Sequence, residues 1–208
     1  MPGGPRQRGR YHHGDLPSAL LDAGLEQLAT AGPAGFSVAE VARRVGVSTA
    51  APYRHFTDRD GFLAAVAARA AERLAAAVVA AATDDDPRDR LAAAAGAYAL
   101  FVAEHRTGFD VIYASALRAA RDADLAAAGR AVMALFLEPA REIAGDGALG
   151  LTEQVVALAH GYGTFDADGF LTADRVTAEP TATRARRAAR ALIAGWDGQR
   201  GGPSTTLP

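Results

Sequence analysis

One short stretch of the chain, V-S-T-A-A-P-Y-R-H-F, places three polar side chains next to one another: Tyr53, Arg54 and His55. An imidazole suits acid–base catalysis, whereas a hydroxyl, a guanidinium and an imidazole together suit hydrogen bonds to phosphates and base edges. Ser48 is a typical N-cap residue, so Pro52 falls within about the first turn of a short helix, where its missing N–H is not needed. The pattern favours a short helix that lies against an acidic partner over a strained catalytic loop.

The segment before this stretch predicts another short helix. Ser37 and Glu40 have the spacing of a capping box, in which the serine accepts from an early amide and the glutamate returns to the cap amide. Gly46 then ends the helix with a residue that tolerates positive φ. Two short helices joined by a glycine-containing turn predict a helix-turn-helix, whose second helix lies in the major groove of DNA.

The second helix of this arrangement carries side chains suited to both kinds of DNA contact. Residues 49–51 are small enough to let the helix approach the bases, and Arg54 can donate to both acceptors of guanine. Tyr53 and His55 can donate to phosphate oxygens. The alternative interpretation is that Tyr53 and Phe56 pack in the core and Ser48 is only a helix cap, and for Phe56 we expect the core position.

The chain carries F-S-V-A-E-V-A-R-R-V, followed by G-V-S-T-A-A-P-Y-R-H-F and T-D-R-D-G-F-L. These motifs, over about residues 11–66, resemble the DNA-binding domain of the tetracycline-repressor (TetR) family. The opening Y-H-H-G-D-L resembles one branch of that family. The resemblance implies a three-helix DNA-binding head, a helical ligand-binding body, a homodimer formed by the last two long helices, and repression relieved by a small molecule.

Carried over by position, the resemblance also implies which residues contact DNA. The implied phosphate contacts are Ser37, Ser48, Thr49, Tyr53, His55 and Arg59, and the implied base contacts are Ala50, Ala51 and Arg54. Arg59 stands where the family usually has lysine, which keeps the positive charge. Val38 and Ala39 stand where some members carry an arginine that reads a base, so specificity would depend more on Arg54 and on the N-terminal arm.

Residues 1–14 are rich in proline, glycine and arginine and predict a flexible basic arm. Three arginines lie in it: Arg6, Arg8 and Arg10. They could enter a narrow minor groove, or the arm could remain a solvated tail. His12 and His13 point in different directions on any regular backbone and have no third ligand nearby in the sequence, so we predict no metal site and no cofactor.

Composition and periodicity predict an all-α protein. Half the residues are apolar, alanine is abundant, and cysteine is absent, which excludes disulfides and thiolate chemistry. No apolar run approaches a membrane span and no secretion signal opens the chain, so we expect a soluble cytoplasmic protein. We expect a helix-turn-helix domain over residues 15–60, a helical body over 61–198 and a disordered tail over 199–208. Helices are expected over about 108–121 and 125–144, and from a cap at Thr152.

Aromatic and histidine side chains of the body could line an apolar ligand pocket, or they could form plain core. They are Tyr98, Phe101, His105, Phe109, Tyr113, Phe136 and His160. The segment A-L-A-H-G-Y-G resembles the His-Gly pair of a C-terminal domain found in the same branch, with Val156 where that domain has tryptophan. Gly161 and Gly163 would allow close helix approach at a dimer interface.

The sequence contains no G-x-S-x-G, P-loop or H-E-x-x-H motif, so we do not predict an enzyme. We expect a dimeric bacterial transcription regulator, a repressor that binds palindromic double-stranded DNA and releases it when a small molecule binds. Two alternatives come from other classes. One is a DNA-binding protein without a small-molecule effector. The other is a small helical enzyme that uses His105 and His160 with an acid such as Asp110 or Asp166.

Overall fold

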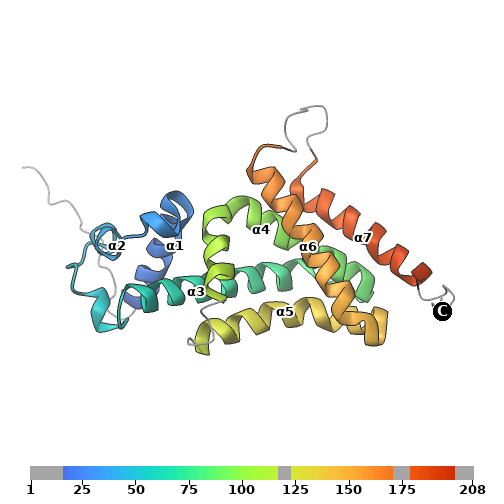
Figure 1. Ribbon diagram of the computed structural model, residues 1–208, viewed down its shortest axis with the longest axis horizontal. Coiled ribbons are helices and arrows are strands. Elements are labelled where there is room, and N and C mark those ends of the chain that lie inside the picture. Colours follow the sequence, from blue (N-terminus) through green and yellow to red (C-terminus); the bar gives the residue numbers. More distant parts are fainter. Residues whose placement is uncertain (1–15, 117–122, 171–178, 200–208) are drawn as a thin grey trace, which may run out of the picture.

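A computed structural model of the 208-residue chain describes residues 16–116, 123–170 and 179–199. These residues form a small head and a larger body, both helical, and the described segments contain no strand, so the all-α prediction is confirmed (Figure 1). The head consists of α1 (Leu16–Gly35), α2 (Val38–Val45), the 3₁₀ helix η1 (Pro52–Arg54) and the start of α3 (Arg59–Ala81). The body contains the rest of α3, α4 (Pro87–Ala116), α5 (Ala123–Ala144), the 3₁₀ helix η3 (Gly145–Gly147), α6 (Ala148–Ala167) and α7 (Thr181–Gln199).

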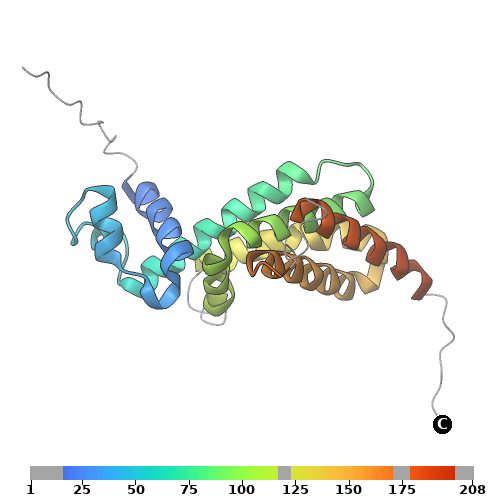
Figure 2. The same cartoon turned by 90° about the horizontal axis from the view of Figure 1, so that it is seen from above.

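Helix α3 belongs to two hydrophobic cores. Ala70 packs in the core of the head, and the next residue, Ala71, packs in the core of the body. The two views show α3 leaving the head and running along the body without interruption (Figures 1 and 2). Because a helix is stiff along its axis, the orientation of the head depends on how the body holds α3.

The corner between α1 and α2 is held by a buried side-chain amide. Ser37 begins α2 as predicted, and its Oγ accepts from the Glu40 amide at 3.4 Å. The other half of the predicted capping box is wrong: Gln27 Oε1, not the Glu40 carboxylate, accepts from the Ser37 N–H at 3.1 Å, and Glu40 pairs with Arg43. Gln27 is 5 % exposed, so a residue of α1 fixes where α2 starts.

The end of α2 follows the sequence prediction, and the start of α3 is capped by the residue that precedes it. Gly46 ends α2 with φ 81° and ψ 25°, the left-handed conformation that glycine adopts without strain. Asp58 caps α3 by accepting from the Gly61 amide at 2.7 Å. Both turns next to the predicted DNA-binding helix are therefore closed by their own residues.

Helix α4 lies at the centre of the body and contacts α3, α5, α6 and α7, and also α1 of the head. A separate helix from about residue 108 was expected, and the backbone does break just before it: His105 is not helical, with φ −123° and ψ 25°, and the helical segment beyond this kink continues to Ala116. The His105 ring accounts for the kink, because its Nδ1 lies 3.0 Å from the Phe101 carbonyl oxygen one turn earlier. The part of α4 beyond the kink stands between the head and the rest of the body (Figure 1).

The expected start of the next helix at Thr152 is wrong. Helix α6 begins at Ala148, and Thr152 is fully buried inside it. Gly163 lies on the inner side of the same helix, since a Cβ there would come within 2.6 Å of the Ala99 carbonyl oxygen of α4. No helix in the described segments is long and apolar enough to cross a membrane.

Candidate DNA-binding tip and body cavity

The predicted DNA-binding helix is a run of tight turns that ends in η1, not a regular α-helix. The Ala51 amide donates to the Ser48 carbonyl at 2.9 Å, and the Arg54 amide donates to the Ala51 carbonyl at 3.2 Å. Pro52 is the first residue of η1, where its missing N–H is not needed. Ala51 rather than Ser48 precedes the helix, and no described side chain caps η1.

Two apolar residues attach this tip to the head. Pro52 is buried, and the half-buried Phe56 ring stacks on Phe62 with centroids 4.5 Å apart. Phe62 in turn contacts Phe36, whose ring centroid is 5.6 Å away. The aromatic cluster therefore sets the position of the turns relative to α1 and α3.

The residues between these anchors face solvent. Tyr53 is 52 % exposed, so the interpretation of Tyr53 as a core residue is wrong. Ser48, Thr49, Ala50, Arg54 and His55 are also exposed, whereas Ala51 is half-buried. The hydroxyl of Tyr53, the guanidinium of Arg54 and the imidazole of His55 therefore lie on one exposed tip, and small side chains lie beside them.

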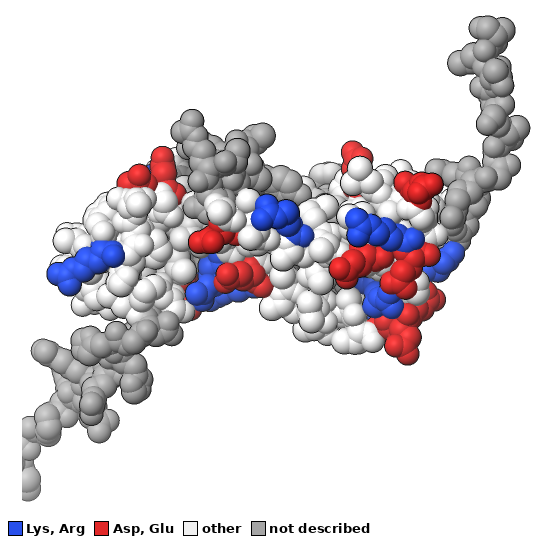
Figure 3. Space-filling model, turned by 90° about the horizontal axis from the view of Figure 1, so that it is seen from below, with Lys and Arg blue, Asp and Glu red and all other residues white. Residues whose placement is uncertain are grey.

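Arg54 differs from the other arginines of the head that the structure describes. Arg43 pairs with Glu40, and Arg44 Nη2 lies 2.7 Å from a Glu26 carboxylate oxygen. Arg54 makes no side-chain hydrogen bond or ion pair with any described residue, so its donors are available to a base or a phosphate. Figure 3 shows basic atoms at the outer end of the head, while the body carries mixed patches of both signs.

Arg59 has a structural role that the sequence did not suggest. Its Nε donates to the Phe36 carbonyl oxygen at 3.3 Å, and its guanidinium carbon lies 6.0 Å from the centre of the Phe36 ring. Its Nη1 also lies 3.4 Å from the Asp60 carboxylate. With a side chain 45 % exposed, Arg59 joins the start of α3 to the α1–α2 corner and still reaches solvent. Ser37 is exposed at the start of α2.

The predicted ligand residues whose side chains the structure describes lie in aromatic contacts of the body. Tyr98, Phe136 and His160 come together, but as packed rings: Tyr98 lies edge-on to Phe136 at 5.8 Å and to His160 at 6.3 Å. Tyr98 is 2 % exposed and Phe136 is fully buried, which makes both part of the main core. Phe101 is 6 % exposed and belongs to the same core, and its ring stacks on His105 with centroids 4.3 Å apart.

Several other predicted residues fall where the structure describes no side chain. Phe109 and Tyr113 lie in α4 beyond the kink, where only the backbone is described. Arg6, Arg8 and Arg10 lie outside the described residues. So do the histidines at positions 12 and 13, and the tail over 200–208.

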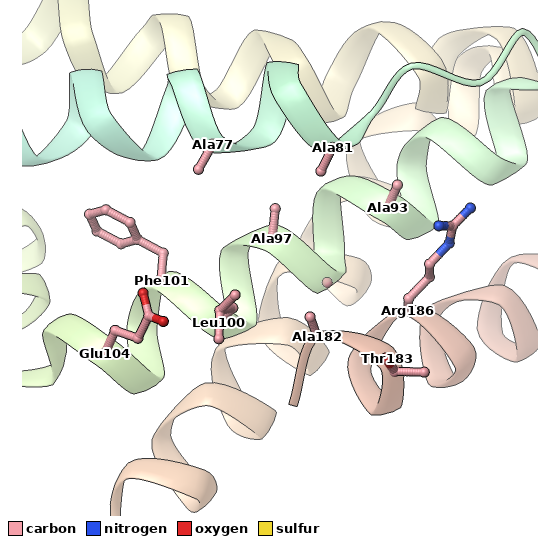
Figure 4. A pocket seen from close by; sticks show the side chains of 11 residues that line it. Ala77, Ala81, Ala93, Ala97, Leu100, Phe101, Glu104, Ala182, Thr183 and Arg186 are labelled. Atoms are coloured by element: carbon pink, nitrogen blue, oxygen red, sulfur yellow. The ribbon is translucent and has the colours of Figure 1, made fainter. Parts of the chain in front are cut away.

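A cavity of about 410 Å³ opens between α3, α4 and the start of α7 (Figure 4). Its lining residues are Ala77, Ala81, Ala93, Gly96, Ala97, Leu100, Phe101, Glu104, Ala182, Thr183 and Arg186. Of the predicted pocket residues, Phe101 also lines this cavity. Sequence reasoning looked for aromatic side chains, whereas the available signal was small residues at helical spacing on α3 and α4.

The head, with exposed donors on its second helical segment, has the arrangement of a helix-turn-helix DNA-binding domain. Residues 20–66 match the model of the family described as bacterial regulatory proteins, tetR family. The chain also resembles a solved protein of unknown function from Rhodococcus sp. RHA1, with 31 % identity over 90 % of this chain and 98 % of that chain, at a TM-score of 0.74. The head therefore matches the DNA-binding domain of the tetR family of bacterial regulatory proteins over residues 20–66.

Other solved structures share the fold at lower identity. A TetR-like transcriptional regulator from Rhodococcus sp. RHA1 is 19 % identical, with 89 % of this chain and 96 % of that chain covered and a TM-score of 0.63. The TetR-family regulator PfmR from Thermus thermophilus is 17 % identical, with coverage of 84 % and 97 % and a TM-score of 0.62. No curated protein matches the chain. Head and body together thus share the fold of these solved proteins.

Proposed function

We propose that the protein is a homodimeric transcriptional repressor that binds a palindromic operator and releases it when a small molecule binds to the body. The observation that carries this proposal is the exposed guanidinium of Arg54, which pairs with no described residue and sits between Tyr53 and His55 on a tip anchored by Pro52 and Phe56. Arg54 would read a base in the major groove, and its two neighbours would hold phosphates.

A second copy is needed because a palindromic site presents two half-sites about one helical turn (~34 Å) apart. Helices α6 and α7 support such a pairing, since both carry small residues on the outside. An added Cβ on Gly161 or Gly195 would meet no described atom within 4 Å, and Ala157 and Ala191 are exposed. Two copies packed through α6 and α7 would form a four-helix interface with close backbone approach.

The cavity in the body supports release by a small molecule rather than constitutive DNA binding. Its volume of about 410 Å³ falls in the usual range for ligand sites. A ligand that binds one arrangement of the body more tightly than the other would shift the population toward that arrangement. Since α3 is shared by both cores, the two heads of a dimer would then stand at a separation that no longer matches the half-sites.

The experiment is to select an operator from random duplexes and to measure binding by fluorescence anisotropy at two salt concentrations. Arg54→Ala should cost about 1–3 kcal/mol of discrimination at one base pair. Tyr53→Phe should weaken selected and random DNA alike, because a phosphate contact carries no sequence information. Arg141→Ala, which removes an exposed arginine of α5, is the matched control and should change neither affinity.

Two outcomes would contradict the proposal. If Arg54→Ala lowers affinity for selected and random DNA by the same factor, Arg54 does not read a base. If the wild-type protein shows no preference for any selected duplex, the protein is not a sequence-specific regulator.

A further inference from the structure

We propose that the cavity between α3, α4 and α7 binds an elongated organic cation, an alkyl chain that ends in an ammonium group, with the ammonium beside Glu104 and Phe101. The binding of this ligand class is argued from the lining of the cavity alone. That the bound ligand also acts as an effector rests on the proposed function of the protein as a ligand-controlled regulator.

The walls of the cavity suit an aliphatic chain. Ala77 and Ala81 of α3 face Ala97 and Leu100 of α4 across the open space, as Figure 4 shows. Because these side chains are short and apolar, they leave room for a chain and offer it no hydrogen bond. Methylene groups that enter this space are removed from water, which is favourable.

The two ends of the cavity carry opposite charges, and the two charges are not equally available to a ligand. Arg186 lies at one end and is already neutralised, with its Nη2 3.2 Å from an Asp84 carboxylate oxygen. Glu104 lies at the other end, and its side chain makes no hydrogen bond or ion pair with any described residue. Among the described residues that line the cavity, Glu104 is therefore the charged one without an ionic partner, and its carboxylate attracts a cation and repels an anion.

Phe101 gives the same end a second feature that favours a cation. Its ring lies beside Glu104 at the cavity, and one face of the ring is stacked on His105. The ring carries negative charge density on its faces, so an ammonium that reaches the other face gains a cation–π contact in addition to the carboxylate. A carboxylate ligand would find neither contact there.

The position of Glu104 and Phe101 connects the cavity with the head. Both residues lie in the turn of α4 that ends at the His105 kink, and α4 contacts α1 of the head. A ligand that moves the Phe101 ring also disturbs the contact between His105 Nδ1 and the Phe101 carbonyl oxygen. The angle of the kink sets how the last part of α4 stands against the head, so binding and head orientation are coupled through this turn.

The test compares three ligands with the same chain: octyltrimethylammonium, octanol and octanoate, each below its micellar concentration. Binding to the full-length protein without DNA is measured by isothermal titration calorimetry at low and at high salt. We expect the cation to bind about tenfold more tightly than the alcohol at low salt, the size of one charge contact at a partly exposed site, and octanoate to bind most weakly. High salt should reduce the preference.

Variants assign the binding to this cavity. Glu104→Gln should equalise the cation and the alcohol, whereas Glu153→Gln, which neutralises an exposed glutamate of α6, should leave the preference for the cation intact. Ala81→Phe should weaken all three ligands by filling the cavity. Since Ala81 is exposed, the helical circular dichroism of this variant should remain that of the wild type.

The proposal is overturned if octanoate binds as tightly as the cation, if Glu104→Gln keeps the preference, or if no ligand binds at millimolar concentration. A separate operator assay tests the regulatory role. If the cation binds as expected but operator affinity does not change, the site stands and the effector role fails. If no operator can be selected, the proposed function fails while the binding result is unaffected.

Discussion

Gln27→Met removes the acceptor that joins α1 to the start of α2 and keeps most of the side-chain volume. Gln27 is 5 % exposed, and its Oε1 accepts from the Ser37 N–H at 3.1 Å. Methionine cannot replace that acceptor, so the Ser37 amide must find water or remain unpaired. Leaving a partly buried donor without its partner costs about 1–3 kcal/mol, and we expect the free energy of unfolding to fall by that amount.

Urea unfolding followed by circular dichroism measures the change, with the slope m expected to stay constant because the surface exposed on unfolding does not change. The neighbouring Glu26→Gln is the matched control. It removes an exposed ion pair with Arg44, which should cost no more than about 1 kcal/mol. A loss below about 0.5 kcal/mol for Gln27→Met would refute the reasoning, because the amide contact would then contribute nothing beyond a solvent hydrogen bond.

Three further changes test the packing and charges of other contacts. Gly163→Ala should destabilise the protein by about 1–3 kcal/mol in thermal unfolding, because the added Cβ would meet the backbone of α4. Its control is Gly129→Ala, whose added Cβ meets no described atom within 4 Å and which should stabilise the protein by about 0.5–1 kcal/mol. Leu125→Ala should cost about 2–5 kcal/mol in urea unfolding, since this residue is 3 % exposed; a smaller cost would mean that the site collapses without a cavity. Asp22→Asn should cost at most about 1 kcal/mol, and the cost should shrink as salt is added, because its ion pairs with α3 are partly exposed.

Local rules predicted the parts of the head that depend on nearest neighbours in the sequence. Gly46 ends α2 because few other residues adopt its φ of 81° without strain, and Pro52 starts η1 because that position needs no N–H. The exposure of the three residues between Pro52 and Phe56 also follows from the short spacing of these two anchors. These features were predictable because each depends on interactions within a few residues.

Features that depend on contacts between distant segments were not predictable in the same way. The capping box pattern at Ser37 and Glu40 was present, but Gln27 is better placed to satisfy the amide, and its position depends on how α1 packs. The break before residue 108 was predicted, but the contact between His105 Nδ1 and the Phe101 carbonyl oxygen at that break was not, because it depends on the orientation of the ring.

The cavity could not be predicted from the sequence for a related reason. A stripe of alanines is consistent with tight helix packing as well as with open space, and the outcome depends on the neighbouring helix. At Gly96 the packing is tight, since an added Cβ would lie 2.7 Å from the Ala182 carbonyl oxygen. Gly96 and Ala182 form one wall of the cavity, and beside that close contact the small residues Ala77 and Ala81 of α3 leave open space.

The head is not an independent body that a single linker holds. Its core contains Leu125 from the first turn of α5, in addition to residues of α1, α2 and α3. The head also contacts α4 through α1. Three helices of the body therefore fix its orientation, and a change in only one of them must work against the other two. A ligand that acts at the His105 kink alters the α4 contact directly, and the Leu125 contact of α5 opposes the resulting movement of the head. Truncating that side chain should therefore strengthen the coupling between ligand and operator where each still binds.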